Sequence, residues 1–186
     1  MASLTTPVCE FDTAAIDFNL KDTNGKSLTL ADVKGKNGTI IAFICNHCPY
    51  VQAILPRLIE DVAKLKELGV NTVAIMSNDS SDYPEDSPEN MKKIAEEMAF
   101  PFPYLLDDTQ QIAKAFGAIC TPDFFGYNSE LKLQYRGRFD ESRKESAPYN
   151  SRHDLLEAMK QIAQTGKGPS DQVPSIGCSI KWKDSN

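Results

Sequence analysis

The sequence has no long hydrophobic run, no basic stripe and no internal repeat. No segment approaches the roughly 20 apolar residues of a membrane-spanning helix, and the first residues lack the basic stretch and apolar run of a secretory signal. The net charge is -6 and the pI is near 5.0. A surface that follows nucleic-acid phosphates or an anionic membrane is therefore not expected. We expect a soluble, cytoplasmic protein whose partners are small molecules or other proteins.

Cysteine is scarce and odd in number. A chain of 186 residues with 41% hydrophobic residues can build one core without disulfide staples. A redox or metal role therefore fits the cysteines better than a structural disulfide framework does. We expect a single domain over 1–186, with a core at about 16–165 and a C-terminal tail at 166–186. The five cysteines are Cys9, Cys45, Cys48, Cys120 and Cys178.

Alternating apolar and polar residues near the N-terminus predict a hairpin. Residues 16–20 and 27–30 lie on either side of the turn signal Asn24-Gly25, a combination typical of two short antiparallel strands. Residues 39–44 are predominantly apolar, as in a strand that is covered on both faces. We therefore expect 39–44 at the centre of the sheet.

The remaining segments alternate between helices and strands. Apolar residues recur at helical spacing over 51–68, and 70–76 is predicted as the next strand. This order predicts an α/β fold with a mixed central sheet, helices on both faces and an N-terminal β-hairpin. The later predicted elements are a helix capped by Ser87 and Pro88, a short helix at 110–116, a hairpin of 123–127 and 131–136, and a last helix that opens with the capping box Ser151-Arg152-His153-Asp154.

A Cys-x-x-Cys motif with an internal histidine follows the central strand. If Cys45 opened the next helix, Pro49 would fall inside its first turns and remove a hydrogen bond. If Cys48 lies at the helix N-terminus instead, Pro49 becomes the first helical residue, where its missing N–H costs nothing. The proline therefore places Cys48 at the helix N-terminus.

The order of these segments resembles the thioredoxin fold, and more narrowly the redoxin branch of the alkyl hydroperoxide reductase/thiol-specific antioxidant superfamily with its disulfide-reductase relatives. The residues that carry the resemblance are 17–26, 43–56 and 120–125, within a similarity that runs from about 16 to about 162. The resemblance implies that Cys48 takes the place of the nucleophilic cysteine. It also implies that Thr121 and Pro122 form a cis bond in a loop that packs over the nucleophile.

The motif departs from the family pattern at two points. Val51 stands where the second cysteine of related proteins lies, so Cys45 is the expected resolving thiol, with Cys120 next and Cys178 reachable only if the tail folds back. Peroxiredoxins of this superfamily carry a threonine and a proline where this chain has Cys45 and Ile41. This second departure counts against an ordinary peroxiredoxin.

The amide groups and partial positive charge of a helix N-terminus should favour a thiolate at Cys48, and a protonated His47 would act in the same direction. If the pKa falls from about 8.5 to about 7, the ionised fraction at pH 7 rises from a few per cent to about half. We expect Cys48 to attack a disulfide, or a peroxide, and Cys45 then to displace the product. The reaction needs no cofactor, and the sequence does not indicate the thiol reductant.

Three alternatives remain open at this stage. A thiol-dependent peroxidase would use the same Cys48. A metal-binding protein of this fold would use Cys45, His47 and Cys48 as soft ligands. A scaffold without activity would carry an unreactive Cys48. Cys120 can equally be core filler, Cys9 and Cys178 are expected to be small hydrophobes, and the acidic run 79–86 is expected to be a solvated loop.

Overall fold

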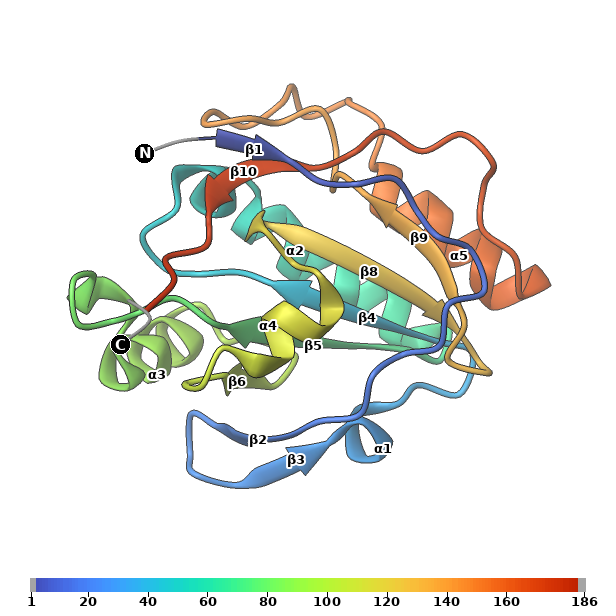
Figure 1. Cartoon of the computed structure of the whole chain (residues 1–186). Coiled ribbons are helices and arrows are strands. Elements are labelled where there is room, and N and C mark those ends of the chain that lie inside the picture. The colour runs from blue at the N-terminus through green and yellow to red at the C-terminus, as the bar shows by residue number, and fades with distance from the viewer. Residues whose placement is uncertain (1–2, 184–186) are drawn as a thin grey trace.

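The structure is a computed structural model that describes residues 3–183. A seven-stranded mixed sheet forms its centre (Figure 1). The strands are β2 (Asn19–Asp22), β3 (Ser27–Thr29), β4 (Gly38–Phe43), β5 (Val70–Met76), β6 (Tyr104–Leu106), β8 (Asp123–Asn128) and β9 (Leu133–Gly137), and their order in the sheet is β3-β2-β6-β5-β4-β8-β9. The N-terminal hairpin, now β2 and β3, and the later hairpin, now β8 and β9, are both confirmed.

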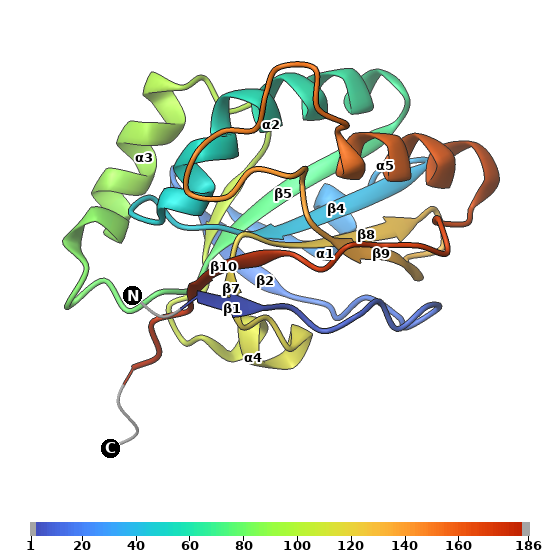
Figure 2. The same cartoon turned by 90° about the horizontal axis from the view of Figure 1, so that it is seen from above.

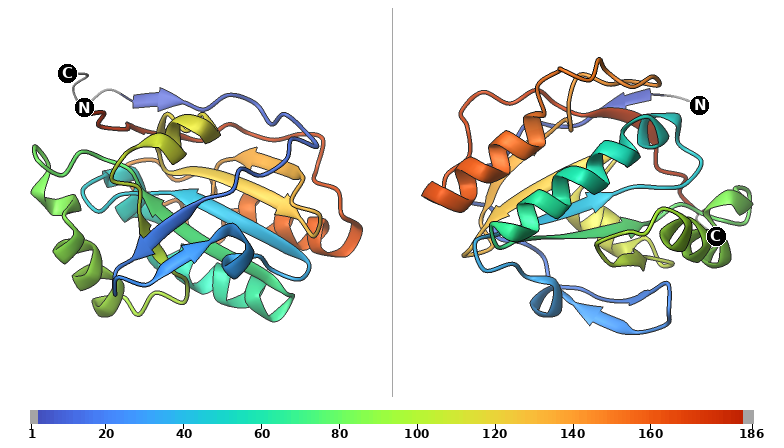
Figure 3. Two further views of the ribbon diagram at one scale, coloured as in Figure 1. Left: turned by 60° about the horizontal axis from the view of Figure 1, so that its bottom comes forward. Right: turned by 180° about the vertical axis from the view of Figure 1, so that it is seen from behind.

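The sheet carries helices on both faces, as the sequence predicts. Figure 2 shows α2, α3 and α5 on one face and α4 on the other, and Figure 3 shows α2 and α5 side by side. The small α1 packs into the same apolar cluster as α4. The helices are α1 (Leu30–Val33), α2 (Pro49–Glu67), α3 (Pro88–Glu97), α4 (Gln111–Phe116) and α5 (Asp154–Thr165), with a 3₁₀ turn η1 at Pro84–Asp86.

Strand β4 lies at the centre of the molecule because its residues are apolar on both faces. All six of its residues are buried, with β5 parallel on one side and β8 antiparallel on the other. Ile40 and Ala42 pack into the cluster under α2 and α5, whereas Ile41 and Phe43 pack into the cluster under α1 and α4. The position at which β4 ends therefore fixes where the Cys-x-x-Cys loop begins.

The tail folds back onto the core and forms a second, three-stranded sheet. Its strands are β1 (Ser3–Thr5), β10 (Ile176–Ser179) and β7 (Cys120–Thr121), with β10 in the middle and antiparallel to both neighbours. Figure 1 shows β1 and β10 side by side above the main sheet. The region expected as a tail outside the core thus contributes a strand beside β7.

The predicted capping box of the last helix does not form. Helix α5 begins at Asp154 with His153 as its N-cap, and no side chain caps it. The Ser151 hydroxyl instead donates to Glu141 at 2.6 Å, and His153 Nδ1 donates to the buried Asp61 at 2.5 Å. Ser151 and His153, which the local pattern assigns to the capping box, therefore bind residues far away in the sequence instead.

None of the helices within residues 3–183 combines the length and the apolar character that crossing a bilayer requires.

We predict that helix α2 stabilises the protein mainly through the side chains that it packs against the sheet. Leu58 is 1% exposed in the cluster between α2 and the sheet, so Leu58→Ala should lower the free energy of unfolding by roughly 2–5 kcal/mol. The exposed Glu60 on the same helix provides the control. Glu60→Ala should change the free energy of unfolding by less than about 0.5 kcal/mol in the same urea titration. Equal effects of the two substitutions would contradict this packing.

Candidate active site

Cys48 is the N-cap residue of α2, and Pro49 is the first helical residue. The register that Pro49 predicts is therefore confirmed. The Cys48 side chain is 0% exposed and lies in the cluster under α2. Its sulfur makes no hydrogen bond with the amides of α2, so the donors that the sequence analysis expected from the helix come from other elements.

Groups from three segments act on the Cys48 sulfur. They lower the pKa of Cys48 to about 5, and the largest contribution comes from the Cys45 thiol, followed by the Cys178 thiol, the Thr121 hydroxyl and the backbone N–H of Cys178. Burial acts in the opposite direction. In its thiol form Cys48 would donate to the Thr121 carbonyl oxygen 3.1 Å away, a contact that favours the neutral form. The four groups that favour the charged form outweigh it.

Cys45 is the neutral member of the pair. It is 1% exposed, and its sulfur lies 3.2 Å from the Thr121 hydroxyl. Its pKa is raised well above the usual value, first by the hydrogen bond to Cys48, then by burial and then by the charge of Asp86. Two neighbouring groups whose pKa values are pushed apart indicate different roles in one reaction. Cys48 is suited to attack, and Cys45 to hold a proton until later.

The bond between Thr121 and Pro122 is cis, as the sequence predicts. This loop lies against both sulfurs, because the carbonyl of Thr121 contacts Cys48 and its hydroxyl contacts Cys45. Cys120 does not join them. Its sulfur lies 3.8 Å from the Pro122 carbonyl, and burial followed by the charge of Asp123 raises its pKa far above the usual value. Cys120 is placed as a buried thiol rather than as a partner of Cys48.

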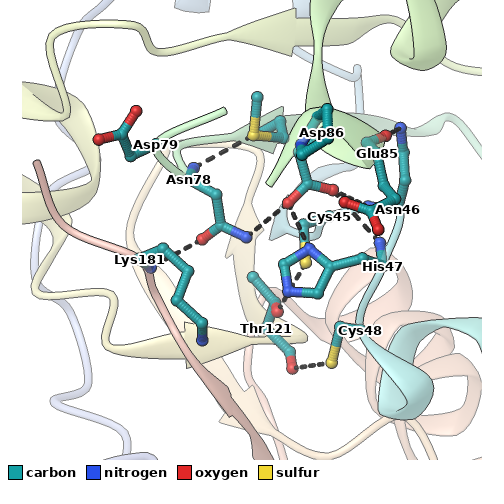
Figure 4. A network of polar contacts seen from close by, with 12 residues as sticks. Cys45, Asn46, His47, Cys48, Asn78, Asp79, Glu85, Asp86, Thr121 and Lys181 are labelled. Atoms are coloured by element: carbon teal, nitrogen blue, oxygen red, sulfur yellow. Dashed lines mark hydrogen bonds and ion pairs between the residues drawn. The ribbon is translucent and has the colours of Figure 1, made fainter. Parts of the chain in front are cut away.

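His47 faces a buried carboxylate instead of the Cys48 sulfur (Figure 4). Its Nδ1 donates to Asp86 Oδ2 at 2.6 Å, and its ring stacks on Tyr83 with centroids 4.7 Å apart. Asn78 Nδ2 donates to the same oxygen at 2.9 Å. The other carboxylate oxygen accepts from the backbone N–H of Asn46 at 2.7 Å and of His47 at 3.2 Å. One carboxylate therefore holds the loop between the two cysteines.

Asp86 and Asn78 are not among the site residues that the sequence predicts. Asp86 is 0% exposed, so the prediction of a solvated acidic loop is wrong at its last residue. Burial by itself would raise the pKa of Asp86, but the hydrogen bonds from His47 and Asn78 outweigh it and keep the pKa below the usual value. Nothing in the local sequence distinguishes Asp86 from its acidic neighbours, because its partners come from two other segments, at Asn46-His47 and at Asn78.

Soft-metal ligands are only partly available here. Ligand atoms of Cys45, His47 and Asp86 lie within 4.8 Å of one another. Both oxygens of Asp86 already accept two hydrogen bonds each. His47 Nε2 is buried and has no hydrogen-bond partner within residues 3–183. Of this group, Cys45 and His47 Nε2 remain, which is fewer than the four ligands of a closed structural site. Metal binding by Cys45, His47 and Cys48 stays an alternative.

The chain is similar to thiol-dependent redox proteins. It is 30% identical over 119 residues to the thiol-disulfide oxidoreductase ResA of Bacillus subtilis, covering 64% of this chain and 62% of that protein. The corresponding ResA of Halalkalibacterium halodurans is 26% identical over 104 residues, covering 55% and 54%. Peroxiredoxin Q of Populus jackii is 28% identical over 109 residues, covering 59% and 46%. The chain thus matches about half to two thirds of the length of these curated relatives.

Solved structures share the fold over most of the chain. An uncharacterized conserved protein from Geobacillus kaustophilus is 44% identical, with a TM-score of 0.94 and coverage of 100% of this chain and 99% of that one. The thioredoxin domain of a thiol-disulfide oxidoreductase from Bacteroides vulgatus is 18% identical, with a TM-score of 0.62 and coverage of 82% and 97%. This second likeness establishes the thioredoxin-like fold. Because the family model for AhpC/TSA matches residues 11–139 of 186, the protein belongs to the AhpC/TSA family.

Proposed function

We propose that the protein is a thiol-disulfide oxidoreductase in which Cys48 is the nucleophile and Cys45 a resolving thiol. The observation that carries the proposal is that one residue of the cis-proline loop contacts both sulfurs: the Thr121 carbonyl oxygen lies 3.1 Å from Cys48, and the Thr121 hydroxyl lies 3.2 Å from Cys45. The pKa of Cys48 is lowered and the pKa of Cys45 is raised, which suits Cys48 to be the thiolate and Cys45 the thiol. The likeness to ResA proteins and the cis bond at Pro122 support the same reaction class.

The reaction proceeds through two exchanges of sulfur. The Cys48 thiolate attacks one sulfur of a disulfide, forming a mixed disulfide and releasing the other half as a thiolate. Cys45 then loses its proton and attacks the Cys48 sulfur, which releases the second half and leaves a Cys45–Cys48 disulfide. The substrate gains the two electrons that the cysteine pair loses. An external thiol must return them for the next cycle.

The substrate reaches the site beside the cis-proline loop. Cys45 and Cys48 are both buried, so the covering segments must shift before a disulfide contacts the sulfur. A cavity of about 220 Å³ adjoins these segments, and it is lined by Tyr50 at the start of α2, by Pro122, and by Ser175 and Ile176 next to Cys178. We propose that disulfides of proteins or small molecules approach through this cavity. A cytoplasmic location stays a prediction.

A thiol-dependent peroxidase is the second candidate function. The likeness to peroxiredoxin Q favours it, since a peroxidase needs the same kind of low-pKa thiolate. Cys45 and Ile41, however, occupy the places of the family's threonine and proline. We therefore rank disulfide exchange first.

We predict that the Cys48 thiolate titrates near pH 5 in the reduced protein. The ultraviolet absorbance of the thiolate should rise with pH with a midpoint near 5, and Cys48→Ala should show no such rise in this pH range. Cys45→Ala removes the main donor to the thiolate, so the midpoint should rise by about 1–2 pH units, because a hydrogen bond to a charged group contributes roughly 1.5–3 kcal/mol. A midpoint near that of a free thiol in the unchanged protein would contradict the proposal and favour an inactive scaffold.

We predict that trapping identifies Cys48 as the attacking residue. With a disulfide substrate, Cys45→Ser should accumulate more mixed disulfide than the unchanged protein does, because one thiol that completes the exchange is missing. Cys48→Ser should accumulate none and should lose disulfide reduction altogether. Peptide mass spectrometry locates the adduct. An adduct on Cys45 in Cys48→Ser would reverse the assignment of the two cysteines.

We predict that the reduced protein reduces insulin disulfides with a dithiol donor and consumes hydrogen peroxide slowly. The reason is that the residues beside Cys48 replace those that peroxiredoxins use. Both rates are measured with the same protein and donor, with Cys48→Ser as the control for each. Rapid peroxide consumption with little insulin reduction would establish the second candidate function instead.

A further inference from the structure

The strand β10 places a third thiol against Cys48. In the antiparallel pairing of β10 with β7, Cys178 lies opposite Thr121, and the carbonyl of Thr121 is the group 3.1 Å from the Cys48 sulfur. The thiol and the backbone N–H of Cys178 both lower the pKa of Cys48. Cys178 is 2% exposed. It is therefore enclosed with the nucleophile rather than presented on the surface.

The position of β10 is fixed on both sides of Cys178. On the N-terminal side of Cys178, the Ser175 hydroxyl donates to the Pro122 carbonyl at 2.8 Å. After it, the Lys181 N–H donates at 2.9 Å to the side chain of Asn78, which also binds Asp86. The tail is thus tied both to the cis-proline loop and to the carboxylate that holds the loop between Cys45 and Cys48.

Gly177 allows this close approach. A Cβ at Gly177 would lie 2.0 Å from the Thr121 carbonyl oxygen and 2.5 Å from its carbon. Backbone atoms of a paired strand cannot yield by that much, so only glycine lets β10 pack at this distance from Thr121. The contact between Cys178 and Cys48 therefore depends on the residue that precedes Cys178.

The charges around the two candidate resolving thiols differ in sign. The pKa of Cys178 is raised to about 12, first by burial and then by the hydrogen bond and charge of Cys48, while Lys181 and Lys144 act to lower it. Cys45 faces Asp86, which raises its pKa. When Cys48 enters a mixed disulfide its negative charge disappears. Cys178 is then left with cations nearby and Cys45 with an anion, so Cys178 loses its proton more easily.

Building on the proposed function, we propose that Cys178 is a second resolving thiol, which attacks the Cys48 mixed disulfide and forms an internal Cys48–Cys178 disulfide. In this step Cys178 gives up a proton, a new bond joins the two protein sulfurs, and the substrate half leaves as a thiolate. Cys48 and Cys178 together lose the two electrons that the substrate gains. Cys45 can then attack Cys48, releasing Cys178 and leaving the Cys45–Cys48 disulfide.

Oxidised glutathione tests the proposal in variants that lack Cys45. All variants carry Cys9→Ser, because Cys9 is partly exposed and would react by itself. In Cys45→Ala, glutathione should first attach to Cys48 and then leave, giving two free glutathione molecules per chain and a Cys48–Cys178 cross-link in peptide mass spectrometry. In Cys45→Ala with Cys178→Ala, the adduct on Cys48 should persist and release only one. Cys45→Ala with Cys120→Ala is the matched control, and it should behave as Cys45→Ala does.

A second variant tests the role of β10 without removing the thiol. Gly177→Ala in the Cys45→Ala chain should displace β10 from Thr121 and prolong the life of the Cys48 adduct at least 10-fold, while circular dichroism shows that the core remains folded. A persistent adduct in Cys45→Ala itself, or a cross-link from Cys48 to Cys120, overturns the role of Cys178. Absence of any adduct on Cys48 in Cys45→Ala with Cys178→Ala overturns the proposed function instead, so the two failures are distinguishable.

Discussion

A buried negative sulfur is tolerated at Cys48 because hydrogen-bond donors from different parts of the chain converge on it. An isolated charge of this kind would be costly to remove from water. The Cys45 thiol comes from the loop after β4, and the thiol and N–H of Cys178 come from β10. The pairing of β10 with β7 and the fixed conformation of the Cys-x-x-Cys loop therefore both hold donors close to the Cys48 sulfur. If either were lost, the anion would lose donors and its pKa would rise.

The loop between the cysteines is itself held by one carboxylate. Asp86 accepts two backbone N–H groups from this loop, and it fixes the ring of His47 through Nδ1. A tautomer with the proton on Nδ1 leaves Nε2 as an acceptor, and that nitrogen is buried without a partner among residues 3–183. Asp86 also raises the pKa of Cys45. The same residue thus fixes the conformation of the loop and adds to the effects of Cys48 and burial that keep Cys45 protonated.

The sequence predicts the fold well because its main signals are local and strong. The uniformly buried β4, the two hairpins and the helix capped by Ser87 all follow from periodicity and turn residues within a few positions. The exceptions involve partners far away in the sequence. Ser151 binds Glu141 and His153 binds Asp61, so the predicted capping box is absent. The tail carries too few residues with a clear period to predict a strand that pairs with β7.

For the site, the backbone chemistry of proline in the local sequence was sufficient to place Cys48 at the helix N-terminus. A residue without an N–H fits the first helical position and disrupts later ones, so Pro49 fixes the register before any tertiary contact forms. The contact of Asp86 with His47 joins residues 39 positions apart, and Cys178 approaches Cys48 only through the pairing of β10 with β7. Such contacts form only when the whole sheet assembles, because the free energy that holds them comes from packing and from hydrogen bonds between separate strands and loops.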